Sequence, residues 1–137
     1  MHRGFLLIAA LLGGLGVAAG AFGAHGLERV TSDEKIIHGF QTGVQYQIYH
    51  AIALLSLAVL YGRVPLNAIK WAANFFIIGV ILFSGSLYVL TYLKVQDSNA
   101  IKIVGPITPI GGLCFIIGWL FLVLAAYKYK VRPGVEE

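Results

Sequence analysis

Four long apolar stretches without a charged side chain are the feature that most constrains how this chain can fold. A helix that crosses the hydrocarbon of a membrane needs about 20 consecutive, mostly apolar residues. Inside lipid every backbone polar group needs an internal partner, so such stretches fold as helices. The 137-residue chain carries them at residues 5–24, 46–61, 71–93 and 107–127. The sequence therefore predicts an all-α integral membrane protein, an up-down bundle of four transmembrane helices.

The composition excludes a soluble protein and a nucleic-acid partner. Apolar residues make up 58% of the chain, above the roughly 45–50% of soluble domains, and charged residues are only 12%. The net charge is +4, but the basic residues are scattered through short loops and form no stripe for a phosphate backbone. We expect one domain over residues 1–137, embedded in the lipid bilayer, with a basic C-terminal tail at 128–137.

The loops predict the orientation, because Lys and Arg are enriched on the cytoplasmic side of membrane proteins. If the spans alternate in direction, six of the ten basic residues share one side of the membrane: Arg3, Arg63, Lys70, Lys128, Lys130 and Arg132. The other four share the opposite side: Arg29, Lys35, Lys94 and Lys102. We therefore expect a bacterial inner-membrane protein with both termini in the cytoplasm.

Small residues recur at helical spacing in the first span and predict its packing face. Gly16 and Gly20 stand four apart, with Gly23 beside them and Ala24 extending the row. Lipid is as apolar as a leucine side chain, so helices associate in membranes largely through close packing along such rows. We expect this span to be the packing centre and to remain in the mature protein, although residues 19–21 resemble a signal-peptide cleavage site. In the fourth span we expect close packing at Gly111, Gly112 and Gly118.

The second span has a longer helical run before it. Thr31 and Glu34 have the spacing of a capping box, and no proline interrupts the chain from Ser32 to Tyr61. About 30 residues at 1.5 Å each exceed the thickness of the hydrocarbon. The stretch up to about Gln45 is therefore expected to form a short interfacial helix in the first outer loop.

A stripe of polar side chains runs down this second helix. Because polar groups in lipid cost several kcal/mol unless they are satisfied, we expect the stripe to face the bundle interior or a wet cavity. The expected partners on the third span are Asn74, Ser84, Tyr88 and Thr91. The cleft is also expected to include Thr108, at the Pro/Gly-rich start of the fourth span, where Pro106 and Pro109 suit a first helical turn. The stripe consists of His38, Gln41, Thr42, Gln45, Tyr49 and Ser56.

This polar stripe and His25 fall on the same, outer side of the membrane and together define a candidate polar cleft. The cleft has two interpretations. Its groups satisfy one another between helices, or they bind an anion, a carbonyl or a lipid head group near the positive end of the fourth helix.

His50 is the one ionisable group other than tyrosine that is expected within the hydrocarbon. Such a residue is a functional candidate by default. The alternative is a neutral histidine bonded to Tyr46, one turn earlier, or to the third span. No cofactor is expected. A haem needs two axial ligands on facing helices, and the third and fourth spans have no histidine to pair with His25 or His50. No metal is expected either, because His25 and His38 lack further ligands at suitable spacing.

Three motifs in order resemble one protein family. They are Gly20-Ala-Phe-Gly-Ala-His-Gly-Leu27, Tyr49-His-Ala-Ile-Ala-Leu-Leu55 and Pro109-Ile-Gly-Gly-Leu-Cys-Phe-Ile-Ile-Gly-Trp119. With them the chain resembles, over essentially its whole length, the small bacterial inner-membrane family labelled domain of unknown function 423, related to eukaryotic transmembrane protein 256. The resemblance implies four membrane helices and residence in the bacterial inner membrane. It implies no activity.

These observations predict a non-enzymatic protein, since the chain has no Ser/His/Asp set, no carboxylate pair in a span and no phosphate-binding loop. The role we expect is that of an accessory or assembly component that packs against partner membrane proteins or against copies of itself. The alternative is a small channel or carrier for a small solute or lipid that uses the outer polar cleft.

Overall fold

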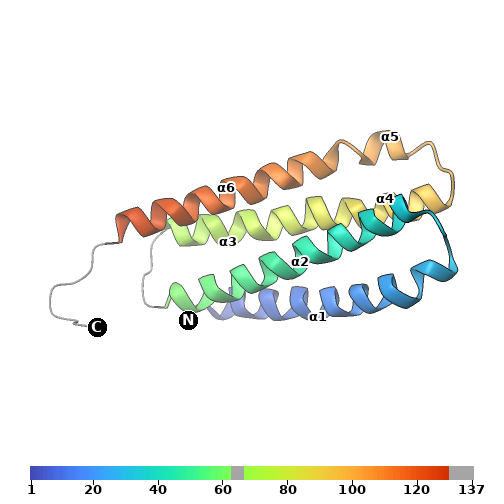
Figure 1. Ribbon diagram of the computed structural model, residues 1–137. Coiled ribbons are helices and arrows are strands. Elements are labelled where there is room, and N and C mark those ends of the chain that lie inside the picture. Colours follow the sequence, from blue (N-terminus) through green and yellow to red (C-terminus); the bar gives the residue numbers. More distant parts are fainter. Residues whose placement is uncertain (63–66, 130–137) are drawn as a thin grey trace.

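The computed structural model describes residues 1–62 and 67–129. Most of the expected tail at 128–137 thus falls outside the described residues. Four helical segments in the described part are long and apolar enough to cross a membrane, as expected: residues 3–29, 34–60, 67–95 and 101–128. They run alternately up and down beside one another, and the start of the first and the end of the fourth lie at the same end of the molecule (Figure 1).

The helices extend beyond the apolar stretches at most ends. Because a membrane helix satisfies its backbone internally, it continues into the interface until a proline, a glycine or a turn stops it. In chain order the elements are α1 (Arg3–His25), the 3₁₀ turn η1 (Leu27–Arg29), α2 (Glu34–Leu60), α3 (Asn67–Gly79), the π-helical turn η2 (Val80–Ser84), α4 (Gly85–Val95), α5 (Ile101–Val104) and α6 (Ile107–Lys128). The third span is therefore one long segment made of α3, η2 and α4.

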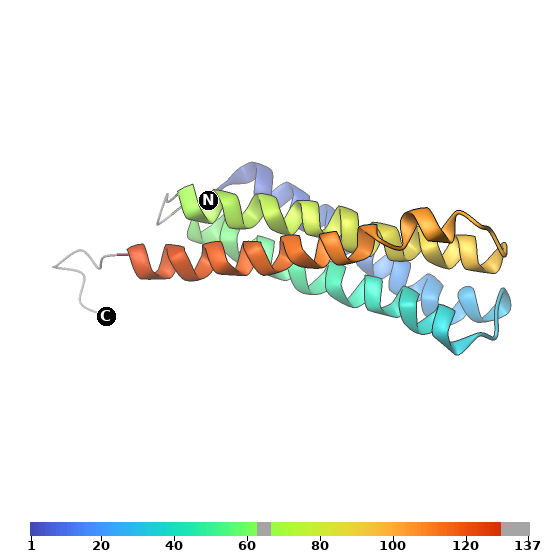
Figure 2. The same ribbon diagram turned by 90° about the horizontal axis from the view of Figure 1, so that it is seen from above.

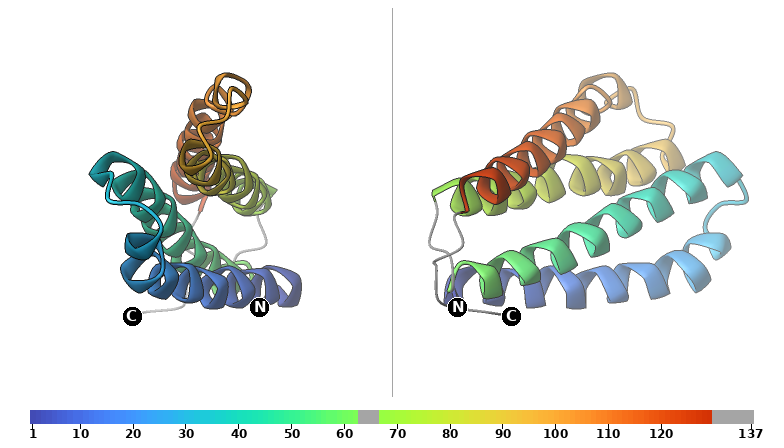
Figure 3. Two further views of the ribbon diagram at one scale, coloured as in Figure 1. Left: turned by 90° about the vertical axis from the view of Figure 1, so that its right-hand side faces the viewer. Right: turned by 60° about the vertical axis from the view of Figure 1, so that its left-hand side comes forward.

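The four spans form two packed pairs. α1 packs along α2, and α6 packs along α3 and η2, while α2 joins the pairs through its contacts with α3, η2 and α4. α1 and α6 lie at opposite margins of the molecule (Figure 3), and the view from above shows the long segments lying side by side (Figure 2). α2 and the third span are thus the central helices, and α1 is peripheral rather than the expected packing centre.

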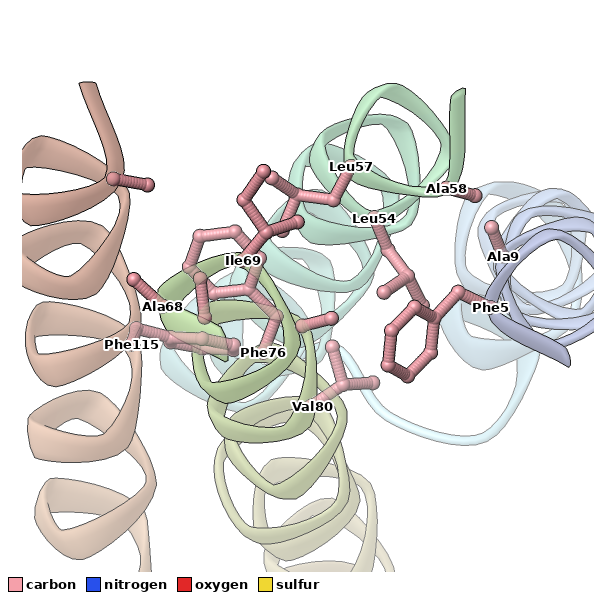
Figure 4. Packing of buried hydrophobic residues seen from close by; sticks show 13 residues of the cluster. Phe5, Ala9, Leu54, Leu57, Ala58, Ala68, Ile69, Phe76, Val80 and Phe115 are labelled. Atoms are coloured by element: carbon pink, nitrogen blue, oxygen red, sulfur yellow. The ribbon is translucent and has the colours of Figure 1, made fainter. Parts of the chain in front are cut away.

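The apolar core lies between these central helices. Phe5 and Ala9 of α1 meet Leu54 and Ala58 of α2, and the cluster continues to the Phe76 ring of α3 (Figure 4). A side chain that is exposed to lipid is also in apolar surroundings. The core therefore stabilises the fold by close contact rather than by removing side chains from water. The outward-facing positions are large and apolar as well, among them Leu7, Leu11, Leu15, Ile116, Leu120 and Val123.

The start of α2 differs from the predicted capping box. Asp33 is the N-cap, with its Oδ1 accepting a hydrogen bond from the Lys35 N–H at 2.8 Å. The Thr31 hydroxyl accepts from the Asp33 N–H at 3.2 Å instead. A carboxylate at the cap also offsets the positive end of the helix dipole, which favours Asp33 over Thr31. The outer part of α2 is continuous with the membrane-crossing part, and the first outer loop itself contains η1.

Glycines make room for neighbouring side chains along α1. A methyl group added at Gly16 would lie 2.6 Å from Ile48 Cδ1, and one at Gly23 would lie 3.0 Å from the Phe40 ring. At Gly20 the nearest atom, Val44 Cγ1, is 3.4 Å away, which is ordinary contact. Ala24 is exposed, so it does not extend this row as expected, because a helix turns by 100° per residue and Gly23 takes the facing position.

Glycines of α6 form the second seam. Gly111 lies directly against the backbone of Leu82 and Phe83, and a methyl group added at Gly118 would lie 2.6 Å from the Phe76 ring. At Gly112 the nearest atom is 3.7 Å away in the Phe83 ring. Gly111 and Gly118 therefore set the distance between α6 and the third span, whereas Gly112 leaves space beside it.

Candidate functional site

A buried glutamine of α2 links three helices. Gln47 is 5% exposed. Its Nε2 donates to the Leu12 carbonyl of α1 at 2.8 Å, and the Tyr88 hydroxyl of α4 donates to its Oε1 at 2.8 Å. A polar side chain is costly in hydrocarbon unless it is satisfied, and here both ends of the amide have partners. This network is a structural cross-link that is closed to an outside ligand.

Two glycines create the space for this network. A methyl group at Gly16 would lie 3.3 Å from Gln47 Nε2, and one at Gly43 would lie 3.0 Å from the Tyr88 ring. Any side chain at either position would push the amide or the phenol away from its partner. Glycine is therefore needed here for close approach rather than for backbone conformation.

A second polar contact joins α4 to α6. The Ser86 hydroxyl donates to the Phe83 carbonyl at 2.9 Å and lies 2.7 Å from the Thr108 hydroxyl. Because the Ser86 proton is used for the carbonyl, Thr108 is the donor between the two hydroxyls. Thr108 was expected in the cleft beside the stripe of α2, and it bonds instead to Ser86 of the third span.

His50 is buried, and both of its ring nitrogens are bonded. Its Nδ1 lies 2.8 Å from the Tyr46 carbonyl, and the Trp119 Nε1–H points to its Nε2 at 3.3 Å. An indole N–H can only donate and a carbonyl can only accept, so Nδ1 carries the proton and the ring is neutral. Tyr46 is one of the two partners that the sequence suggested for a neutral His50. The other suggested partner was on the third span, and the structure has Trp119 of the fourth span instead.

An aromatic crevice opens beside His50, between α2 and α6. Its volume is about 520 Å³. The His50 ring stacks on the Phe115 ring at 3.5 Å between centroids, and the Tyr46 and Phe83 rings lie 4.6 Å apart. We call this the α2–α6 crevice, and it is lined by Tyr46, His50, Phe83, Pro109, Gly112, Leu113, Phe115, Ile116 and Trp119.

The π-helical turn η2 forms part of this crevice. It interrupts the third span at Val80–Ser84 and contributes Phe83 to the crevice wall. Single π turns within α-helices occur often at functional sites, because they change the direction in which side chains point. Ser84 of this turn is fully buried, and its hydroxyl has no hydrogen-bond partner among the described residues.

The polar stripe of α2 lies on the outside of the molecule, so the prediction that it lines the bundle interior is wrong. Gln41 and Gln45 are exposed, and Tyr49 is 58% exposed. The buried face of α2 is the opposite one, which carries Gly43, Gln47 and Leu54. Packing decides this rotation, because a face with glycine and alanine lets the neighbouring helices approach closely, and two long glutamines would hold them apart.

The other residues of the expected cleft are not brought together either. His25, His38 and Asn74 are exposed, and α1, which carries His25, lies at the opposite margin from α6 (Figure 3). The end of α1, whose last residue is His25, and the start of α6 do lie at the same end of the molecule, as expected (Figure 1). A separate depression of about 540 Å³ at this end is lined by Glu28, Glu34, Lys35, Ile37, His38 and Gln41.

Sequence reasoning missed several residues that form the interior contacts, namely Gln47, Ser86 and Trp119. Gln47 has helical spacing from Gly43 and Leu54, and this periodicity of small and apolar positions marks the buried face of α2. A polar residue on that periodic face was the available signal. Trp119 and Ser86 carried no such signal, because their partners come from other helices.

The comparisons with known proteins agree on one family. A family model described as "Protein of unknown function (DUF423)" matches residues 19–112. UPF0382 membrane protein SH2409 of Staphylococcus haemolyticus is 42% identical over 125 residues, covering 91% of this chain and 96% of that protein. UPF0382 membrane protein YwdK of Bacillus subtilis is 42% identical over 126 residues, covering 91% and 97%. No solved structure matches the chain.

These relatives are named only as membrane proteins, and nothing in the family description indicates catalysis. Together with the four long apolar helices, the comparisons show a multi-pass membrane protein without an identified specific role. Among the described residues, no three His, Cys, Asp or Glu side chains come together as a metal site would require.

Proposed function

The chain belongs to the DUF423 family of proteins of unknown function, and we propose that it is a non-enzymatic accessory component of the bacterial inner membrane. In this role it associates with another membrane protein, or with copies of itself, through the outward face of α2. The observation that carries the proposal is the exposure of Gln45 and Tyr49 on the outside of α2.

The depth of these two residues follows from the α1–α2 contacts. Gly20 faces Val44 and Gly16 faces Ile48. Gln45 and Tyr49 are therefore level with the apolar stretch of α1, well inside a hydrocarbon layer of about 30 Å. The Gln45 amide has no hydrogen-bond partner among the described residues, which is costly where no water is present.

A transmembrane partner would remove this cost. Glutamine and tyrosine both donate and accept hydrogen bonds, so the face can pair with a polar helix of another protein or with itself about a two-fold axis. Interhelical hydrogen bonds in membranes contribute about 0.6 kcal/mol on average.

The alternative, a channel or carrier with an outer polar cleft, has lost its supporting feature. The stripe that was to line the cleft faces outward, and the Gln47–Tyr88 contact occupies the interior at that depth. We therefore retain the association role.

The test is the association state of the variant Gln45→Leu/Tyr49→Phe. We expect wild-type protein, extracted in mild detergent, to appear in native mass spectra as an oligomer or with a bound membrane protein, and the variant to appear alone. Leu120→Ala, a change at an exposed position of α6, is the control and should leave association intact. A wild-type protein that is monomeric and free of partners, both in detergent and in lipid nanodiscs, would refute the proposal.

A further inference from the structure

We propose that the α2–α6 crevice binds a membrane-dissolved molecule with a planar conjugated ring that carries a carbonyl oxygen, the chemistry of a lipophilic quinone. This site is distinct from the association face, because it lies between α2 and α6 and uses none of the exposed glutamines. Its volume of about 520 Å³ is within the range of small-molecule sites, about 300–1,000 Å³.

The walls of the crevice favour a flat ring. Tyr46, Phe83 and Phe115 lie within 6.0 Å of one another between ring centroids, and the His50 ring stacks on Phe115. Aromatic rings prefer offset or tilted neighbours with centroids about 4.5–7 Å apart. A ligand ring in the crevice can make such contacts with the partly exposed rings of Tyr46, Phe83 and Trp119, which a saturated chain cannot do.

The crevice is held open by contacts behind its walls. The Trp119–His50 hydrogen bond fixes two of the rings. The Gly111 backbone contact with Phe83 holds α6 against the π-helical turn, and the Phe115 ring fills the space beside Gly79. Because these contacts exist without a ligand, binding requires little ordering of the protein.

One hydrogen-bond donor remains for the ligand. The indole N–H of Trp119 and the Nδ1–H of His50 are both used within the protein. The Tyr46 side chain is 39% exposed, and its hydroxyl has no partner among the described residues. The site therefore offers a single phenol donor, which calls for an acceptor oxygen on the ligand.

The depth of this donor separates a quinone from an ordinary lipid. Tyr46 is between Val44 and Ile48, the positions that face Gly20 and Gly16, so its hydroxyl lies inside the hydrocarbon. The ester oxygens of a phospholipid stay near the membrane surface, and its chains carry no acceptor. A ring carbonyl dissolved in the hydrocarbon can reach the hydroxyl.

Fluorescence quenching tests this site directly, because the chain has two tryptophans and one of them lines the crevice. Trp71→Phe leaves Trp119 as the reporter, and Trp119→Phe leaves Trp71, which is 54% exposed to the membrane compared with 47% for Trp119. The probe is a benzoquinone with a ten-carbon alkyl chain, added to phosphatidylcholine nanodiscs. We expect saturable quenching of Trp119 and only linear, non-saturating quenching of Trp71.

Two variants and one competitor define the chemistry. Gly112→Leu fills the crevice, since a methyl group there is only in ordinary contact with Phe83, and it should abolish saturable quenching. Tyr46→Phe removes the donor and should raise the half-saturating concentration about fivefold, the effect of one neutral hydrogen bond. Decylbenzene, which lacks carbonyl oxygens, should not displace the quinone.

Thermal midpoints of both variants without the probe show whether they are folded. If Gly112→Leu lowers the midpoint strongly, Ile116→Phe serves as a second blocking change at an exposed lining position and adds no tryptophan to the assay. Equal linear quenching of the two tryptophans would overturn the proposal. Displacement by decylbenzene as effective as that by the quinone would also overturn it, because the crevice would then accept any apolar chain.

Discussion

Gln45 and Gln47 are two positions apart on α2 and lie in opposite environments. Gln47 is buried and bonded to α1 and α4, whereas Gln45 is exposed on the outside of the molecule. In lipid the cost of an amide depends on whether a partner is within reach, and not on burial alone. The same side chain is therefore a structural cross-link at one position and, in our proposal, part of an association surface at the other.

The Gln47–Tyr88 bond can be measured with a double-mutant cycle of Gln47→Leu and Tyr88→Phe. We expect each single change to destabilise the protein and the double change to cost less than their sum, with a coupling of about 0.6–1.7 kcal/mol. The measurement is unfolding by sodium dodecyl sulfate in mixed micelles, followed by circular dichroism. Additive single effects would show that the bond does not contribute to stability.

Among the helices, α1 is attached to the molecule along one narrow row. Gly16 and Gly23 face Ile48 and Phe40 of α2 at close range, and the same row carries the buried Phe5 and Ala9. Its N-terminus is tied down further, because the His2 N–H donates to the Ala58 carbonyl at 2.8 Å and the His2 ring stacks on Phe5 at 4.0 Å. The attachment of α1 thus depends on a few positions along one face, two of which are glycines.

Gly16→Leu tests this row, with Gly14→Leu in the same helix as the control. Leucine at Gly16 overlaps Ile48 and displaces the Gln47 amide, so we expect a loss of about 1–3 kcal/mol and a clearly lower thermal midpoint in detergent. Gly14 has open space beside it, so its change should leave the midpoint unchanged or raise it. Gly20→Leu should be intermediate, because its neighbour is in ordinary contact. Similar midpoints for Gly16→Leu and Gly14→Leu would contradict this packing.

For the whole molecule, an even number of spans predicts that both chain ends lie on one side of the membrane. Four membrane-length helices alternate in direction, and the start of α1 and the end of α6 lie at the same end of the structure (Figure 1). The structure by itself has no inside or outside. The side is proposed from the six-to-four distribution of Lys and Arg.

Reporter fusions at Glu137 decide the orientation. We expect a green fluorescent protein fused there to fluoresce in a bacterial host, and alkaline phosphatase fused there to be inactive, because phosphatase needs the oxidising periplasm. Alkaline phosphatase fused after Arg29, in the first outer loop, should be active and is the internal control. Phosphatase activity at Glu137 would place the termini outside.

The sequence alone determined the number of spans, their approximate positions and their alternation. The reason is that backbone polar groups need hydrogen-bond partners in hydrocarbon, and a single stretch of about 20 apolar residues can supply them by forming a helix. The helix starts were also largely readable, as with Pro106 directly before α6, although the cap of α2 is Asp33 rather than Thr31. Gly16, Gly23, Gly111 and Gly118 were recognisable from their spacing and size, and the structure buries all four.

Only the tertiary structure decided how each helix is rotated about its axis, and hence what forms the site. In water, burial of apolar side chains fixes that rotation, but in lipid both faces of a helix are apolar and the usual signal is absent. Polarity then misleads, as it did for Gln41, Gln45 and Tyr49, because close packing of small residues outweighs the satisfaction of a few polar groups. The α2–α6 crevice could not be read from the sequence, since His50, Phe83 and Trp119 come from three spans whose rotations are set by these packing contacts.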